Sequence, residues 1–296
     1  MTPSREFRFK YKNLPVFSGK MILNLLNSST GFFKIDSSLG AKLREISVRI
    51  LGDSIVFQTE NFEIDVSRES ISQIVKNPRR IYGLTKSGFL PLVLMDRDNK
   101  YYQLTLFEGC LTPTIEISGI HMHRTIVDPL FVDAKQKVLA LKPKPKSEVL
   151  EICTGLGYST YWLIRRKCHV ISIEKSREVL ELASWNPWSR HLKHVEILLG
   201  DATKVLQYLP DKRFSYVFHD PPRISIAPEL YSSEFYSEIH RVMRPKGILF
   251  HYVGEPGKKR GKRYLRGVLR RLESAGFRIL RYDARSRGIT AVCIKR

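Results

Sequence analysis

The chain has 296 residues, 43% of them hydrophobic and 27% charged, which is enough apolar sequence for one large or two smaller globular domains. No apolar run approaches the roughly 20 residues that span a bilayer. The N-terminal MTPSREFRFKYK lacks the apolar core of a signal peptide, so we expect a cytoplasmic protein. Four scattered cysteines without a Cys-x-x-Cys pair argue against a disulfide framework and against a zinc site.

The charge is strongly unbalanced. Fifty Lys and Arg against 29 Asp and Glu give a formal net charge of +21, which is unusual for an enzyme of small neutral substrates and indicates a polyanion, nucleic acid first. A proteome rich in Lys and Arg throughout would give the same balance. The basic residues are clustered, however, because the stretch from Gly257 to Arg271, GKKRGKRYLRGVLRR, contains no acidic residue.

The first 140 residues contain short apolar runs separated by turn signals such as Gly52-Asp53. The runs are Ile46–Leu51, Ser54–Gln58, Leu90–Met95 and Tyr101–Phe107. Met21–Leu26 and Arg68–Val75 have helical spacing. We expect an accessory β-rich or α+β domain over residues 1–140, which would bind RNA, followed by an extended linker at residues 141–147, LKPKPKS.

From residue 148 to residue 296 strands alternate with helices. We expect strands at 148–153, 169–174, 195–199, 216–219, 248–253, 277–282 and 289–294, with helices at 159–166, 176–186, 202–209, 232–243 and 263–275. This alternation predicts an α/β domain with a doubly wound, mostly parallel sheet. The last two strands are joined by only Asp283–Gly288, too short for a crossover helix, so they should form an antiparallel hairpin.

A glycine-rich turn follows the first of these strands. The segment EICTGLGYS begins at Glu151 and contains Thr154, Gly155 and Gly157. Glycines allow a ligand to approach the backbone closely, and the helix that follows offers unpaired N–H groups. Such a turn occurs in many nucleotide-binding α/β folds, so alone it is a weak signal.

Acidic residues follow the next two strands. Glu174 ends the second strand, about twenty residues after the turn, where a carboxylate commonly binds ribose hydroxyls. Asp201, followed by Ala202, comes directly after the third strand. Either carboxylate could instead cap a helix. Their common place at the carboxyl ends of the strands, where open α/β sheets bind ligands, favours a nucleotide-like cofactor.

The fourth strand ends in HDPPR, in which Asp220-Pro221-Pro222 resembles the catalytic loop of S-adenosylmethionine-dependent amino-methyltransferases. If the Asp220 carboxylate and the Pro221 carbonyl each accept an N–H, the lone pair of an exocyclic amine can point at the sulfonium methyl. A Pro-Pro turn without chemistry is the alternative. These enzymes usually continue with an aromatic residue; here Arg223 follows, whose guanidinium can stack on a base or pair with a phosphate.

The C-terminal half resembles the class I, Rossmann-like methyltransferase fold. The segments EICTGLGYS, ASWNPWS, GDA, HDPPR, ELYSSEFY and FHYVGEPGKK, with ISGIHMHR further upstream, resemble a family of archaeal methyltransferases, some of which carry spermine-synthase-like labels. The resemblance implies S-adenosyl-L-methionine as cofactor and RNA modification as function. It assigns the cofactor to Glu151, Thr154, Gly155, Gly157, Glu174, Asp201 and Ala202, and catalysis to Asp220, Pro221, Pro222 and Arg223.

Substrate contacts are expected from His121, His123, Arg124, Tyr231, Tyr252, Lys258, Lys259 and Arg260. The two histidines alternate on an extended segment and so share a face, which serves either the active-site mouth or the fold. Tyr231, Phe235 or Tyr236 could supply the missing aromatic of the catalytic loop. Trp188 either covers the adenine or packs a helix end.

These features predict a methyltransferase that acts on an exocyclic base amine in ribosomal or transfer RNA. An aminopropyltransferase is the first alternative, but such enzymes have a Gly-Gly-Gly-Asp-Gly-Gly-like turn and an acidic pocket, whereas this turn reads Cys-Thr-Gly-Leu-Gly among basic surroundings. A non-catalytic RNA-binding protein would not need the carboxylates. A nicotinamide-dependent oxidoreductase would need a third glycine in the turn.

Overall fold

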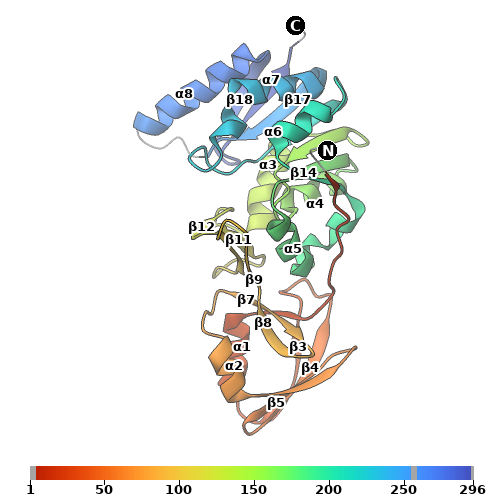
Figure 1. Cartoon of the computed structure of the whole chain (residues 1–296), viewed down its shortest axis with the longest axis vertical. Coiled ribbons are helices and arrows are strands. Elements are labelled where there is room, and N and C mark those ends of the chain that lie inside the picture. The colour runs from red at the N-terminus through yellow and green to blue at the C-terminus, as the bar shows by residue number, and fades with distance from the viewer. Residues whose placement is uncertain (1–4, 255–258, 295–296) are drawn as a thin grey trace. The chain divides into compact units, whose positions relative to one another are not determined.

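The computed structural model describes residues 5–254 and 259–294 (Figure 1). The chain divides into two compact units. Unit 1 comprises residues 1–9, 130–177 and 191–296, and unit 2 comprises residues 10–129 and 178–190. The segment expected to be a linker, residues 141–147, connects α3 (Lys135–Leu141) to β13 (Glu148–Ile152) within unit 1.

Unit 1 is built on an eight-stranded sheet of order β1-β15-β14-β13-β16-β17-β19-β18. Its remaining strands are β1 (Arg5–Glu6), β14 (His169–Glu174), β15 (Glu196–Leu199), β16 (Phe214–His219), β17 (Met243–Tyr252), β18 (Phe277–Asp283) and β19 (Gly288–Cys293). Strands β13 to β17 are parallel, whereas β18 and β19 form an antiparallel hairpin in which β19 lies beside β17. The predicted class I methyltransferase sheet is confirmed.

Helices pack on both faces of this sheet because successive strand residues point to opposite sides. Leu150 of β13 belongs to one core with Tyr236 and Val268, whereas its neighbour Val149 belongs to another with Val138 and Leu163. The described α-helices of unit 1 are α3, α4 (Tyr158–Arg165), α6 (Ala202–Val205), α7 (Ser233–Val242) and α8 (Lys259–Ser274). The shorter helical segments are η1 (Pro129–Ala134), η2 (Pro187–His194), η3 (Leu206–Tyr208) and η4 (Pro228–Tyr231). Segments η1 and η2 include residues that belong to unit 2.

Three details differ from the sequence-based expectation. The helix expected at residues 202–209 consists of α6 followed by the 3-10 turn η3. Strand β17 begins at Met243 rather than at Ile248, because Met243 pairs with Phe214 before an irregularity in the ladder. Strand β1 was not expected; its two residues pair antiparallel with β15, Arg5 opposite Leu199.

Unit 2 is β-rich, as expected for the N-terminal part. Its sheets have the orders β2-β7-β8, β3-β4-β5-β6 and β12-β11-β10-β9. The strands are β2 (Val16–Ser18), β3 (Gly31–Asp36), β4 (Glu45–Leu51), β5 (Ser54–Gln58), β6 (Glu63–Ser67), β7 (Ile81–Thr85), β8 (Gly88–Pro91), β9 (Val93–Met95), β10 (Tyr101–Thr105), β11 (Thr114–Ile117) and β12 (Ile120–His121). The helices are α1 (Gly19–Leu26), α2 (Arg68–Ile74) and most of α5 (Arg177–Trp185). Phe17, Phe57 and Phe89 meet edge to face in its core.

None of the helices in the described part of the chain combines the length and the apolar composition that a membrane-spanning helix requires. Within the same residues, no group of three or more His, Cys, Asp or Glu side chains is arranged to hold a metal ion.

Candidate active site

Four carboxylates converge at the carboxyl ends of β13 to β16. Burial raises the pKa of the Cys153 thiol well above its ordinary value, and the negative charges of Glu174, Asp220, Glu151 and Asp201 raise it further. One thiol senses all four charges because neighbouring parallel strands end side by side. The four acidic residues, which come from four separate sequence segments, therefore lie near one another, close to Cys153.

The two glycines of the turn differ in the space around them: Gly155 has free space beside it, and Gly157 is closely packed. Gly155 has a φ of +56°, and a side chain added there would meet nothing within 4 Å, so its backbone is accessible to a ligand. Gly157 has a φ of +73°, and an added Cβ would lie 2.6 Å from a methyl of Leu192. Thr154 is buried, with its hydroxyl 2.6 Å from that of Ser172. The space beside Gly155 is therefore open, whereas Gly157 packs against Leu192.

Glu151 joins the segments around this turn through hydrogen bonds. Its carboxylate is fully buried and accepts hydrogen bonds from the hydroxyls of Ser159, Thr160 and Ser172, two of them at 2.5 and 2.7 Å. Burial raises the pKa of Glu151, while the three hydroxyls oppose that rise. This arrangement differs from the direct cofactor contact that the resemblance implies, because three hydroxyl donors already hold the carboxylate and tie β13, β14 and α4 together.

Glu174 and Asp201 bind backbone and side-chain donors around the turn. Glu174 accepts N–H bonds of 2.9 Å from Gly155 and Ser176, and burial raises its pKa. Asp201 caps α6 through the N–H of Thr203 at 3.0 Å and pairs with Lys175 at 2.7 Å. Burial opposes ionisation of Asp201, but the bonds from Lys175 and Thr203 lower its pKa overall. Ala202, the first residue of α6, is buried beside it.

Asp220 forms an ion pair that the sequence analysis missed. The ammonium of Lys137, on α3, lies 3.0 and 2.7 Å from the two carboxylate oxygens of Asp220 and 3.0 Å from Asp133. It also lies 4.1 Å from the ring centre of Tyr252. Burial opposes the charge of Lys137, but Asp133 and Asp220 outweigh burial and raise its pKa. The i,i+4 spacing of Asp133 and Lys137 was the available signal, and it is a common one on helix surfaces.

The aromatic residues that follow the Asp220-Pro221-Pro222 loop are buried. Tyr231 is only 2% exposed and donates its hydroxyl to the carbonyl of Pro222 at 2.7 Å. Phe235 and Tyr236 are also buried, so none of the three offers a free ring face to a substrate. The expectation that Tyr231 contacts substrate does not fit this burial; tertiary packing places it as a support of the loop. Arg223, directly after the second proline, is exposed.

Two buried histidines end the neighbouring strands β16 and β17. The rings of His219 and His251 stack with centroids 4.5 Å apart. Nε2 of His219 lies 3.0 Å from the carbonyl oxygen of Leu230, and Nε2 of His251 lies 2.9 Å from the hydroxyl of Tyr236. Burial lowers the pKa of His219 to about 4 and that of His251 well below its ordinary value. Both rings are therefore neutral at pH 7; His219 joins β16 to η4, and His251 joins β17 to α7.

The upstream histidines belong to unit 2. His121 pairs with Glu116 at 3.0 Å and meets the ring of Phe107 edge to face. His123 bonds the hydroxyl of Thr114 at 2.8 Å. These contacts match the structural alternative for both histidines. Arg124, which follows them, is also part of unit 2.

Two further expectations concern Trp188 and the basic segment. The indole N–H of Trp188 donates to the carbonyl of Leu39 at 3.1 Å, within unit 2, as expected for a packed helix end. Lys258 lies outside the described residues. Lys259 and Arg260 begin α8, and their side chains also lie outside the described part.

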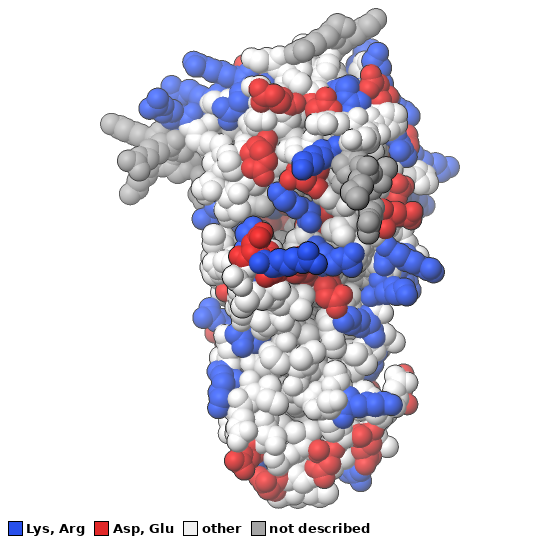
Figure 2. Space-filling view, in the orientation of Figure 1, with Lys and Arg blue, Asp and Glu red and all other residues white. Residues whose placement is uncertain are grey.

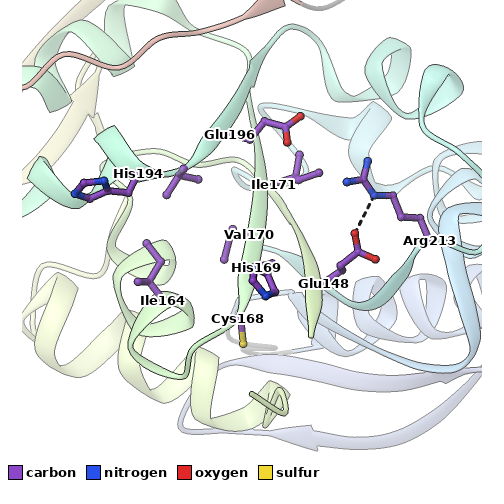
Figure 3. Close-up of a pocket in the computed structure, with 10 residues that line it drawn as sticks. Glu148, Ile164, Cys168, His169, Val170, Ile171, His194, Glu196 and Arg213 are labelled. Atoms are coloured by element: carbon purple, nitrogen blue, oxygen red, sulfur yellow. Dashed lines mark hydrogen bonds and ion pairs between the residues drawn. The ribbon is translucent and has the colours of Figure 1, made fainter. Parts of the chain in front are cut away.

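A cavity of about 360 Å³ lies at the amino ends of the strands, opposite the ends that carry the four carboxylates (Figure 3). It is lined at the amino ends of three strands by Glu148, His169 and Glu196, and Glu148 pairs there with Arg213 at 3.2 Å. Ligands of open α/β sheets bind at the carboxyl ends of the strands. This cavity is therefore not the candidate active site.

Comparisons with known proteins agree with this geometry. Residues 149–247 match a family described as a methyltransferase domain. An uncharacterized protein of Methanocaldococcus jannaschii, MJ1233, is 43% identical over 78% of this chain and 79% of its own length. A polyamine aminopropyltransferase of Prochlorococcus marinus is 27% identical over 55% of this chain and 57% of its own. The structure of spermidine synthase from Thermotoga maritima shares the fold, with a TM-score of 0.53 and 15% identity over 78% of this chain and 75% of that one.

The sheet order, the glycine turn and the family match identify residues 149–247 as part of a methyltransferase domain with the class I fold, whose methyl donor is S-adenosyl-L-methionine. Within this class, the chain belongs to the family of the M. jannaschii protein MJ1233.

Proposed function

We propose that this enzyme transfers a methyl group to an exocyclic base amine in ribosomal or transfer RNA, in the cytoplasm. The observation that carries the proposal is Asp220-Pro221-Pro222 at the carboxyl end of β16, close to the other carboxylates whose charges act on Cys153. Asp220 is the carboxylate on the proline loop, and its side chain is 21% exposed. It can therefore receive a substrate group beside the cofactor.

Two of the remaining carboxylates, Glu174 and Asp201, suit the cofactor. We assign Glu174 to the ribose hydroxyls and Asp201 to the adenine amine, with the open backbone of Gly155 beside the methionine part. A carboxylate offers about four lone-pair sites, so the bonds that Glu174 and Asp201 already make leave room for further donors. S-adenosyl-L-methionine supplies the electrophilic methyl, and its positive charge suits an acidic site.

In the proposed reaction, Asp220 and the Pro221 carbonyl each accept one N–H of the substrate amine. These two bonds turn the nitrogen lone pair away from the ring and toward the methyl group. The N–C bond forms as the S–C bond breaks, the sulfur keeps the electron pair, and the nitrogen then loses one proton to water. Because the base must leave its stack to reach Asp220, the exposed Arg223 is placed to stack on it or to hold a neighbouring phosphate.

The basic helix α8 is the proposed contact for the RNA backbone. Arg263, Arg266 and Arg270 are exposed, and their spacing places them along one side of the helix. Lys and Arg side chains gather around this helix at the upper left of Figure 2. Lys258, Lys259 and Arg260 would extend the surface, and unit 2, with His121, His123 and Arg124, would serve as an accessory RNA-binding domain.

Reversing three charges on α8 tests this contact. The triple variant Arg263→Glu, Arg266→Glu, Arg270→Glu is expected to bind RNA more weakly, with the log–log salt slope reduced by about one per lost phosphate contact. Filter binding over a range of salt concentrations measures the slope. The exposed Lys142, Lys144 and Lys146, changed to Glu, give the same change in net charge as a control. An equal effect in both variants would assign the charge to nonspecific attraction.

Nucleoside mass spectrometry tests the activity. RNA from cells that lack the gene is incubated with the full-length enzyme and S-adenosyl-L-methionine, and one nucleoside is expected to gain a methyl group on its exocyclic nitrogen. Unmodified RNA would contradict the proposal and would leave a non-catalytic RNA-binding protein as the better description.

Aminopropyl transfer is the second candidate, favoured by the 27% identity to a polyamine aminopropyltransferase. The positive net charge of the chain does not favour a polycationic polyamine, but the cluster of carboxylates near Cys153 does. Incubation with an aminopropyl donor and a diamine separates the two candidates. A lengthened polyamine, without methylated RNA, would favour aminopropyl transfer.

A further inference from the structure

Lys137 carries a buried positive charge and pairs with Asp220 of the candidate active site. Its side chain is 3% exposed, and that of its i−4 partner Asp133 is 1% exposed. Burying ions is costly, and an apolar side chain of similar size is often as stable at such a place. Packing alone therefore gives no reason for a lysine here, and the reason has to lie in what the ammonium holds.

The ammonium holds Asp220 by both carboxylate oxygens, at 3.0 and 2.7 Å. The resulting series Asp133–Lys137–Asp220 runs from the interior to the site, since Asp220 is the member with 21% of its side chain exposed. Two carboxylates and one ammonium leave one net negative charge. The exposed end of the series lies where a substrate amine would approach.

We propose that Lys137 is a positioning residue for methyl transfer: it fixes the orientation of the Asp220 carboxylate and keeps that carboxylate ionised. This inference rests on the proposed function and adds a property of the substrate. A carboxylate that is held by an ammonium serves as a hydrogen-bond acceptor rather than as a proton acceptor. The substrate nitrogen therefore enters uncharged, as a base amine does and an aliphatic ammonium does not.

Several acidic or neutral groups lie close enough to Asp220 to be affected by its charge. Besides Asp133, the charge of Asp220 acts on Glu151 and Cys153 at the end of β13, on Tyr231 of η4 and on Tyr252 of β17. The acidic members of this set act against ionisation of Asp220, and the ammonium of Lys137 opposes them. Without Lys137, like charges favour protonation of the Asp220 carboxyl.

The test is Lys137→Met in the full-length enzyme. We expect kcat to fall by about a hundredfold, since a misplaced group at a reacting centre costs that much, with the affinity for S-adenosyl-L-methionine little changed. The acid limb of the kcat profile is expected to move up by about one to three pH units, because activity needs the carboxylate and the ammonium no longer favours that form. Lys137→Arg should keep the acid limb near its original place.

Arg213→Met is the control, because it removes one of the two ion-pair partners of Glu148, the other being Arg244, at the amino ends of the strands. This variant should keep the original kcat and pH profile. If Lys137→Met does not fold, the double variant Asp133→Leu, Lys137→Met removes both buried charges and should show the same shift of the acid limb. An unchanged acid limb in a folded variant would overturn the inference.

A substrate-independent measurement separates this inference from the proposed function. Carbon-13 NMR of aspartate-labelled enzyme follows the Asp220 carboxyl directly, with Asp220→Asn identifying its signal. Its titration midpoint should rise in Lys137→Met whether or not RNA is the substrate, and an equal midpoint in both proteins would contradict the pairing. If the enzyme without substitutions methylates no RNA, that result would instead contradict the proposed function.

Discussion

Asp220→Asn is expected to lower the rate of methyl transfer by about a hundredfold to a thousandfold, the usual cost of losing one preorganised polar contact at a reacting centre. The amide keeps an oxygen that accepts an N–H, so some activity should remain, whereas Asp220→Ala should abolish it. Single-turnover assays with nucleoside mass spectrometry measure the rate. Calorimetry with S-adenosyl-L-methionine should give a nearly unchanged affinity, since Glu174 and Asp201 stay in place.

The two substitutions differ in their effect on stability. Asp220→Ala leaves the buried ammonium of Lys137 with one carboxylate fewer, so we expect a loss of about 1–3 kcal/mol in the free energy of unfolding. Asp220→Asn keeps an oxygen beside the ammonium and should lose less, which makes it the better kinetic variant. Thermal unfolding of both proteins checks this order.

A purified product methylated on carbon or on a ribose oxygen would show that the role assigned to the loop is wrong.

The α/β part of the fold was predictable because its signals are local. Each strand of unit 1 from β13 to β19 has an apolar run, and the short link before β19 requires a hairpin. Strand β1 was missed because two residues carry no periodicity, and their pairing with β15 joins positions almost two hundred residues apart. The 3-10 turn after α6 is a local variation that propensity does not resolve.

The candidate site was predictable in its acidic residues but not in their partners. Glu174, Asp201 and Asp220 were expected in one site because each ends or closely follows a strand, and the carboxyl ends of parallel strands lie side by side. Lys137 was missed because a lysine four residues after an aspartate is usually a surface pair, and burial depends on packing of distant segments. Tyr231 illustrates the opposite error: an aromatic after a catalytic loop suits a stacking surface and a core equally well, and here packing places it in the core.

Glu174→Ala is expected to weaken S-adenosyl-L-methionine binding by about 3 kcal/mol, more than a hundredfold in Kd. The carboxylate would accept two hydroxyl bonds from the ribose, and bonds to a charged group contribute about 1.5–3 kcal/mol each. It also accepts the N–H of Gly155 at 2.9 Å, so its loss should loosen the turn where the cofactor approaches.

Isothermal titration calorimetry measures the effect of Glu174→Ala, with Glu196→Ala as the control. Glu196 is an exposed acidic residue at the amino end of β15, so its removal changes the net charge equally without touching the site. Since burial raises the pKa of Glu174 and binding needs its ionised form, affinity for S-adenosyl-L-methionine should fall as the pH falls through that raised value, and this dependence should vanish in Glu174→Ala. Equal affinities for the original enzyme and Glu174→Ala would rule out this carboxylate as the ribose ligand.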